Sequence, residues 1–438
     1  MDTDTDDSRM FSFDYSLRDL NDLIFEFNIK AYYSDVDHVM SNKERPNFSA
    51  VNAIANVFSE NYGFKVEAGA SLTEKNTIYA GFDYNIVSKD GERKRLVSVN
   101  MCNGMSFDPA REFTDLIWQN SQSTNFGFFV ESTNKLSENL SIIAGLRVDL
   151  DDANINSPAD DFNALYDNDL KREGEINISG NISLKYKPEG KYSYLIAVGR
   201  GVRAPKLIER YVNHFNVGLD AYEYVGNPDL KHEINNQVDL SVMKEGEVLT
   251  FNANVFASYL NNYIAASVDT TLDRKFMPCM QPQHAKRFVN VDKAIQYGFE
   301  LSATYKLIDN LWLEGNVYYT RAQNLDIDEP LEEIPPLSSL ISLVYKTKKF
   351  YSSLNARFVS EQNDVSELSG ETSSEAFNTL DIKLGYKISK MIEVDFGVNN
   401  VFNANYYEHL SRPYNNIGES GMLYEPGRNF VFSAKIEF

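Results

Sequence analysis

Apolar and polar residues alternate with a period of two along most of this chain, which is the pattern of a β-strand with two different faces. In the segment 22–34 one face is apolar, with Leu23, Phe25, Phe27, Ile29, Ala31 and Tyr33. We find about 17 such segments, most of them about 9 to 13 residues long, whereas strands of soluble proteins usually have 5 or 6 residues. Their length fits a tilted strand that crosses a bilayer.

The connections between these segments alternate in length. Short turns are expected at 18–21, 73–76, 136–137, 188–191, 245–247, 308–310, 346–349 and 388–390. Long polar loops are expected at roughly 35–61, 89–123, 151–174, 202–234, 264–294, 322–337, 361–377 and 400–427. Short turns at one end and long loops at the other predict an all-β protein, a transmembrane antiparallel β-barrel with periplasmic turns and extracellular loops. A soluble propeller would need a fixed repeat and short strands, and the sequence has neither.

Aromatic residues near the ends of the expected strands favour the same interpretation. Barrels in membranes carry girdles of aromatic side chains at both interfaces. We assign to such girdles Tyr32, Tyr33, Tyr84, Tyr192, Tyr194, Tyr259, Tyr263, Tyr318 and Tyr319.

Composition excludes several classes of protein. The 438 residues include 42 Lys and Arg and 63 Asp and Glu, for a net charge of −21, which argues against a nucleic-acid partner. The two cysteines and five histidines form no zinc-binding spacing. We find no nucleophile–His–acid grouping, phosphate-binding loop or dinucleotide fingerprint, so we expect no enzyme and assign no catalytic or cofactor-binding residues.

Three segments resemble the TonB-dependent outer-membrane receptor family. The first joins an Arg-Ala-Pro-x-Leu-x-Glu run at 203–209 to a Gly-Asn-Pro-x-Leu-x-x-Glu run at 226–233. The second is the segment 397–408, and the third is the C-terminal segment 424–438 with its terminal Phe438. They occur in the family's order and on the expected strands, and the resemblance covers essentially the whole chain.

The resemblance implies a 22-stranded barrel around an N-terminal plug. Our count is odd and about five strands short, and bacterial single-chain barrels have even counts. We therefore expect residues 1–438 to be one barrel domain, the C-terminal part of a receptor (about 17 of 22 strands), incomplete on its N-terminal side and without the plug. A truncated gene product, a split gene or a partial chain would each explain this. The acidic first seven residues do not resemble a signal peptide.

The same resemblance implies location and partners. We expect a multi-pass barrel in the outer membrane, in contact with outer-membrane lipid. The periplasmic energy-transducing TonB protein would act through the missing plug, and the barrel-assembly machinery would recognise the last strand, which ends at Phe438.

His38 and Met40 resemble the His-x-Met pair of the copper-receptor branch of the family. They follow an outward-running strand, and residues two apart on a strand share a face. Imidazole and thioether ligands suit copper, especially Cu(I). The alternative is an ordinary loop histidine beside a girdle methionine.

Both cysteines lie among methionines in loops expected outside the cell. Soft sulfur donors there suggest capture of a soft metal. The alternative is a disulfide between Cys102 and Cys279 on an oxidising surface. The residues concerned are Met101, Cys102, Met105, Met277, Cys279, Met280 and His284.

The sequence therefore predicts active uptake of a substrate across the outer membrane, with copper or another metal or metal complex as the transported ligand and no resident cofactor. A ferric-siderophore, haem or cobalamin receptor is the first alternative. A non-transporting surface binder or truncated remnant is an alternative of another class.

Overall fold

The structure is a computed structural model, and it describes residues 1–166, 170–216, 220–411, 414–416 and 419–437. Its first strands are β1 (Asp2–Arg18), β2 (Ile24–Ser41), β3 (Val51–Thr73), β4 (Asn76–Val99), β5 (Ser106–Leu116), β6 (Ser121–Ser137), β7 (Leu140–Ile155), β8 (Arg172–Tyr186), β9 (Tyr192–Arg203), β10 (Tyr224–Val225) and β11 (Glu233–Lys244). The remaining strands are β12 (Leu249–Asp273), β13 (His284–Ile308), β14 (Leu311–Asn324), β15 (Glu329–Pro330), β16 (Ser338–Lys346), β17 (Phe350–Val359), β18 (Phe377–Lys387), β19 (Ile392–Asn399), β20 (Tyr414–Asn416), β21 (Glu419–Gly421) and β22 (Asn429–Ile436). Two short helices, α1 (Asp160–Asn163) and α2 (Leu207–Tyr211), lie between β7 and β8 and between β9 and β10.

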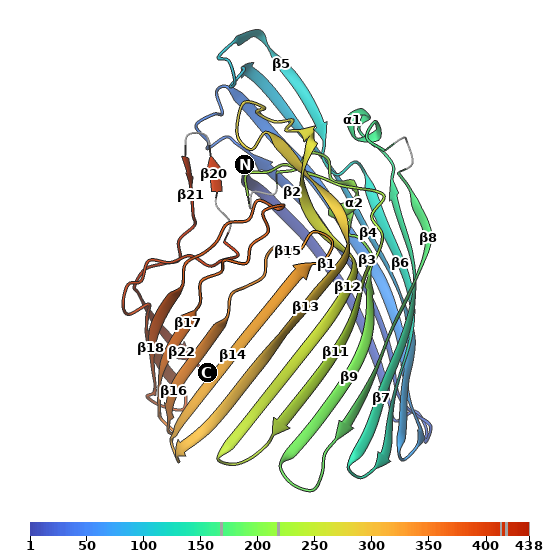
Figure 1. Ribbon diagram of the computed structural model, residues 1–438, viewed down its shortest axis with the longest axis vertical. Coiled ribbons are helices and arrows are strands. Elements are labelled where there is room, and N and C mark those ends of the chain that lie inside the picture. The colour runs from blue at the N-terminus through green and yellow to red at the C-terminus, as the bar shows by residue number, and fades with distance from the viewer. Residues whose placement is uncertain (167–169, 217–219, 412–413, 417–418, 438) are drawn as a thin grey trace.

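Nearly all the strands form one curved wall (Figure 1). The main sheet has 20 strands, and leaving out the local strands β5, β10 and β15 gives the 17 that were predicted. Each of these 17 pairs antiparallel with the next along the chain, from the β1–β2 pair to the β19–β22 pair. The predicted transmembrane antiparallel barrel wall is therefore confirmed, and the eight predicted short turns all lie at one end of it (Figure 1).

The two faces of the wall differ as the alternation predicted. On β8, Ile176, Ile178 and Ile182 are 65%, 54% and 50% exposed on the outer face. Asn177 and Ser179 occupy the inner face between them, and Asn177 donates a hydrogen bond to Asp151 on the neighbouring β7. Apolar side chains that are exposed on the convex side of a sheet this large cannot be the core of a soluble barrel, so this face is built to meet lipid.

The strands at the long-loop end extend further than the sequence predicted. β3 and β4 have 23 and 24 residues, and β12 and β13 have 25 each. The expected loop at 35–61 is thus wrong in its limits, because β2 runs to Ser41 and β3 starts at Val51. Outside a bilayer both faces of a strand meet water or protein, so the polarity pattern that marks a strand fades while the backbone pairing continues.

The proposed girdles are also partly wrong. Tyr32 and Tyr33 are consecutive on β2 and so point to opposite faces. The hydroxyl of Tyr32 accepts a hydrogen bond from the inward-facing amide of Asn85 at 2.6 Å, whereas Tyr33 lies on the outer face with Phe11. Tyr318 and Tyr319 are split between the two faces in the same way.

The buried apolar core lies at the long-loop end. There the four loops 89–123, 151–174, 202–234 and 264–294 pack together, and we call them the cap. One buried cluster includes Phe162 of α1, Tyr211 of α2 and Ala285 of β13, and a second includes Trp118 and Val212. Neither helix, within the part of the chain described, is long or apolar enough to cross a membrane.

Candidate functional site

His38 and Met40 lie on the inner face of β2, near its end at the long-loop rim. In the ladder His38 stands opposite Asp6 of β1 and Val57 of β3, and Met40 stands opposite Ala55. Both belong to the set of alternate residues that includes Glu26 and Lys30, which face the inside of the wall. His38 and Met40 are part of strand β2 rather than of the loop expected at 35–61. Because they are two residues apart on a strand, both side chains lie on the inner face of the wall.

The imidazole of His38 has one neighbour that bears on metal binding. Its Nδ1 lies 3.5 Å from Oδ1 of Asp6, and the side chain is 29% exposed. A carboxylate at one ring nitrogen orients an imidazole and leaves the other nitrogen, here Nε2, for a ligand. Within the described residues no three His, Cys, Asp or Glu side chains gather closely enough to hold a metal by themselves.

The two cysteines are joined to each other. Cys102 and Cys279 form a disulfide with a Cα–Cα distance of 5.4 Å across 177 residues of sequence. Of the two alternatives for the cysteines, the structure has the disulfide. This bond links the 89–123 loop to the 264–294 loop. Met101 precedes Cys102 and Met280 follows Cys279, so each half of the bridge carries a methionine next to it in sequence. His284 lies at the base of the second loop, with Nδ1 3.4 Å from Asp273.

The family-like motifs are linked by Arg203. Its guanidinium donates to Glu209 at 2.8 and 3.0 Å and to Glu233 at 3.1 Å. Glu209 also accepts from the backbone of Lys206 at the start of α2. The arginine of the first motif thus holds the last glutamate of each motif, which gives this region a structural role.

A cavity of 580 Å³ lies beneath this linked segment. Its floor is the inner wall, and its roof is the chain from Arg203 to Ile208. On the floor Arg147 donates to Asp83 at 2.7 and 2.9 Å and to Asp149 at 2.6 Å. Sequence reasoning missed this cavity because its residues come from separate strands.

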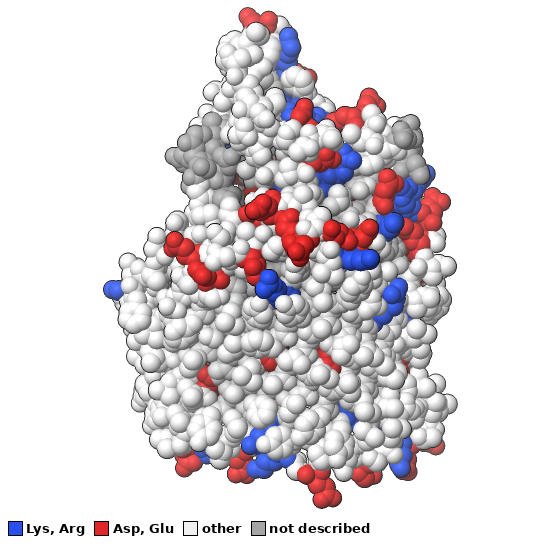
Figure 2. Space-filling view, viewed as in Figure 1, with Lys and Arg blue, Asp and Glu red and all other residues white. Residues whose placement is uncertain are grey.

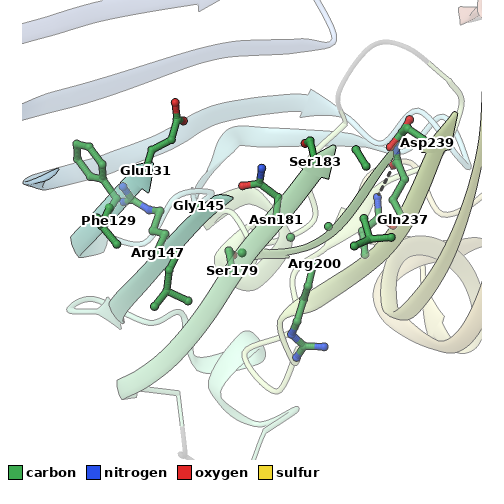
Figure 3. Close-up of a pocket in the computed structure, with 18 residues that line it drawn as sticks. Phe129, Glu131, Gly145, Arg147, Ser179, Asn181, Ser183, Arg200, Gln237 and Asp239 are labelled. Atoms are coloured by element: carbon green, nitrogen blue, oxygen red, sulfur yellow. Dashed lines mark hydrogen bonds between the residues drawn. The ribbon is translucent and has the colours of Figure 1, made fainter. Parts of the chain in front are cut away.

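A second hollow, of 460 Å³, follows the wall toward the short turns (Figure 3). Glu131, Arg147, Asn181 and Gln237 line it, and glycine stands between them at Gly145 and elsewhere. At Gly145 the missing side chain makes room for the amide of Asn181, whose Oδ1 lies 2.6 Å from the position that a Cβ would take.

The cap also carries a patch of arginine and aromatic side chains that no local pattern in the sequence indicates. The guanidinium of Arg93 stacks on the ring of Phe276 at 3.7 Å, and that of Arg95 lies 4.8 Å from the same ring. Arg95 also lies 5.0 Å from the ring of Phe113, which is 42% exposed. Asp115 balances part of this charge, because it accepts from Arg95 at 2.7 Å.

Buried charge holds the cap together. Nζ of Lys286 lies 2.9 Å from Oδ2 of Asp220, and the two side chains are 2% and 9% exposed. Burial alone would raise the pKa of Asp220, but the ammonium of Lys286 and the hydroxyl of Tyr224 hold that pKa below its usual range. Burial raises the pKa of Tyr211 to about 12, and its hydroxyl lies 2.9 Å from two backbone carbonyls of the 151–174 loop, either of which can accept its proton.

The wall, the sorted loops and the inner polar face define a barrel of the outer-membrane receptor type, and a family model agrees. The model described as TonB dependent receptor-like, beta-barrel, matches residues 1–401, and the chain belongs to this family. No curated protein matches the sequence.

Solved structures share the fold. The chain superposes on the copper transporter OprC with a TM-score of 0.81 at 19% identity, covering 100% of this chain and 68% of that one. For the FrpB iron transporter from Neisseria meningitidis (F3-3 variant) the TM-score is 0.67 at 14% identity, with 98% and 63% covered. For the ferric yersiniabactin uptake receptor FyuA from Yersinia pestis it is 0.66 at 15% identity, with 99% and 61% covered. The chain thus spans under two thirds of the length of the last two.

Proposed function

We propose that this protein is an outer-membrane receptor that takes up copper, as Cu(I) or a copper complex, from outside the cell. The observation that carries the proposal is the placement of His38 and Met40 on one inner face at the extracellular mouth of the wall. The similarity in fold to a copper transporter supports it.

The chemistry of the pair favours a soft cation. Thioether sulfur selects Cu(I) over hard cations, and imidazole binds copper well. The Asp6 carboxylate beside Nδ1 would orient the imidazole toward the lumen. Further ligands would come from the incoming complex or from another part of the receptor. The methionines around the Cys102–Cys279 disulfide would offer a first contact further out.

The test is Cu(I) binding by the purified receptor with His38→Ala and Met40→Ala combined. Because two ligands are lost, we expect affinity to fall by at least about 100-fold, beyond the 10- to 100-fold typical of losing an orienting partner. Val36→Ala is the matched control, since Val36 lies two residues before His38 on the same inner face. Unchanged Cu(I) affinity in the double variant would contradict the copper proposal.

An anionic metal chelate, such as a ferric siderophore, is the second candidate substrate. The arginine and aromatic patch of the cap favours it, because guanidinium groups over aromatic rings bind planar anions. Phe113 is the exposed member of the patch. If this candidate is right, Phe113→Ala will weaken binding of a ferric catecholate and leave Cu(I) binding unchanged. Equal catecholate binding by parent and variant would count against it.

Transport would be driven by the periplasmic TonB protein, as the family implies, through a plug segment of the whole receptor. The barrel-assembly machinery would recognise the last strand, β22. Its apolar residues Phe430 and Phe432 are exposed on the outer face. Phe438, the predicted end of that signal, lies outside the described residues.

A further inference from the structure

One cation stands on the face of the wall that meets lipid. Arg200 of β9 is exposed and lies opposite Gly180 of β8 and Asn236 of β11. Figure 3 shows its side chain pointing away from the side of the sheet that carries Asn181 and Ser183. The outer-face residues around it are apolar, since Val198 and Ile178 are 43% and 54% exposed.

Arg9 and Arg321 also face outward in the long-loop half of the wall, and each has a carboxylate nearby. Arg9 donates to Asp35 at 3.0 Å, and Arg321 lies 3.6 Å from Asp364. Arg200 donates only a 3.4 Å hydrogen bond to the Asn236 side-chain oxygen, and among the described residues no ion pair to Arg200 is found. Its charge therefore calls for an anion from outside the chain.

The position of Arg200 along β9 indicates where in the bilayer this anion would lie. Arg200 is eight residues beyond Tyr192, where β9 begins at the short-turn end. At about 3.3 Å per residue and a tilt of roughly 40°, it stands about 20 Å above that end, within an apolar band about 25 Å tall. Figure 2 shows charged side chains gathered above and below such a band on the face in view. A long arginine side chain just under the outer rim reaches upward to the headgroups.

We propose that Arg200, with Asn236 beside it, binds the phosphate of a lipid headgroup in the outer leaflet. Guanidinium groups pair with phosphate through two parallel N–H donors. Gly180, opposite Arg200 on β8, has no side chain that would stand between Arg200 and the headgroup. The apolar residues around the arginine would pack against the acyl chains of the same lipid. This inference rests on the outer-membrane location proposed above.

The test uses the full chain in phosphatidylcholine nanodiscs that contain either diphosphoryl lipid A or lipid A stripped of both phosphates. Native mass spectrometry then measures how much lipid A the protein retains. A basic residue near a membrane surface contributes about fivefold in affinity for anionic lipid, so we expect the parent to prefer the phosphorylated form by about that factor. Arg200→Gln should lose the preference. Arg321→Gln is the control and should keep it, because Asp364 already neutralises Arg321.

Equal retention of the two lipids by the parent, or an undiminished preference in Arg200→Gln, would overturn the inference. Both results are independent of Cu(I) binding at His38 and Met40. A parent chain that never enters the nanodiscs would instead overturn the membrane location on which the inference rests.

Discussion

Removing the ammonium of Lys286 tests how buried charge holds the cap. Lys286 on β13 and Asp220 in the 202–234 loop are almost completely buried, and their charged atoms lie 2.9 Å apart. Asp220 also accepts from the hydroxyl of Tyr224 at 2.7 Å and from the backbone of Tyr222 at 3.0 Å. In Lys286→Met the carboxylate stays buried with these hydrogen bonds but without the ammonium.

The expected loss follows from the burial. Breaking a buried ion pair by removing one partner costs about 3–5 kcal/mol, and the hydrogen bonds that Asp220 keeps put this case at about 3 kcal/mol. Replacing both partners, as Asp220→Leu with Lys286→Met, should recover most of that loss, because no buried charge then remains. Lys187→Met removes an exposed pair with Glu245 at the short-turn end and should change stability by less than about 1 kcal/mol.

The loss of stability in Lys286→Met depends on pH, because the carboxyl group of Asp220 titrates. In the parent the pKa of Asp220 is lowered, so its contribution to stability is present above its ordinary value of 3.8 and is lost as pH falls through the folded-state pKa. Without the ammonium, burial raises the pKa of Asp220, so the variant is least stable at neutral pH and recovers as pH falls through that raised value. The difference between parent and variant should therefore be largest near pH 7 and shrink toward pH 4.

Hydrogen exchange provides the measurement. The amide of Lys286 donates to the carbonyl of Glu223, and β10 pairs with β13 at Tyr224 and Val225. These amides should exchange about 100-fold faster in Lys286→Met at pH 7, which corresponds to about 3 kcal/mol, while amides of the wall stay protected. Exchange that is unchanged in the cap, or a parent–variant difference that does not vary with pH, would refute the reasoning.

Two further predictions concern the cap. Cys102→Ser with Cys279→Ser should lower cap stability by about 2–5 kcal/mol, measured as faster proteolysis of the 264–294 loop, and equal cleavage would contradict it. Gly226→Ala places a Cβ 2.5 Å from the carbonyl carbon of Arg210. It should lower the stability of the cap, measured by hydrogen exchange, by about 1–3 kcal/mol. Gly201→Ala is the control and should lower stability much less, because there is open space around Gly201. Equal effects of the two alanines would be inconsistent with the packing described.

The wall could be predicted from the sequence because each strand in it meets two different media. The alternation on β8 and the tight turn at 73–76, where Thr73 pairs with Asn76, are local patterns that lipid and the lumen impose. Outside the membrane that constraint ends, so the extensions of β3 and β12 were placed in loops. Tyr32 was misassigned because composition near a strand end does not say which face a residue occupies.

The cap was out of reach for a different reason. Phe162, Tyr211 and Ala285 meet only through the folding of three loops, and no period in the sequence links them. The cavity under α2 and the patch of Arg93 with Phe276 arise in the same way. The two-residue spacing of His38 and Met40 predicted that they share one face of a strand, and the structure places both on the inner face. Metal binding by this pair stays a prediction.

Cysteine accessibility at adjacent positions of β8 tests the central claim most directly, because the only native cysteines are joined in a disulfide. Single cysteines at Ile178 and Ser179 are placed in the protein in a bilayer and treated with a water-soluble maleimide. If the wall separates lipid from a wet interior, Ser179→Cys will be labelled rapidly and Ile178→Cys will not. Equal labelling of the two, or the reverse order, would contradict the account.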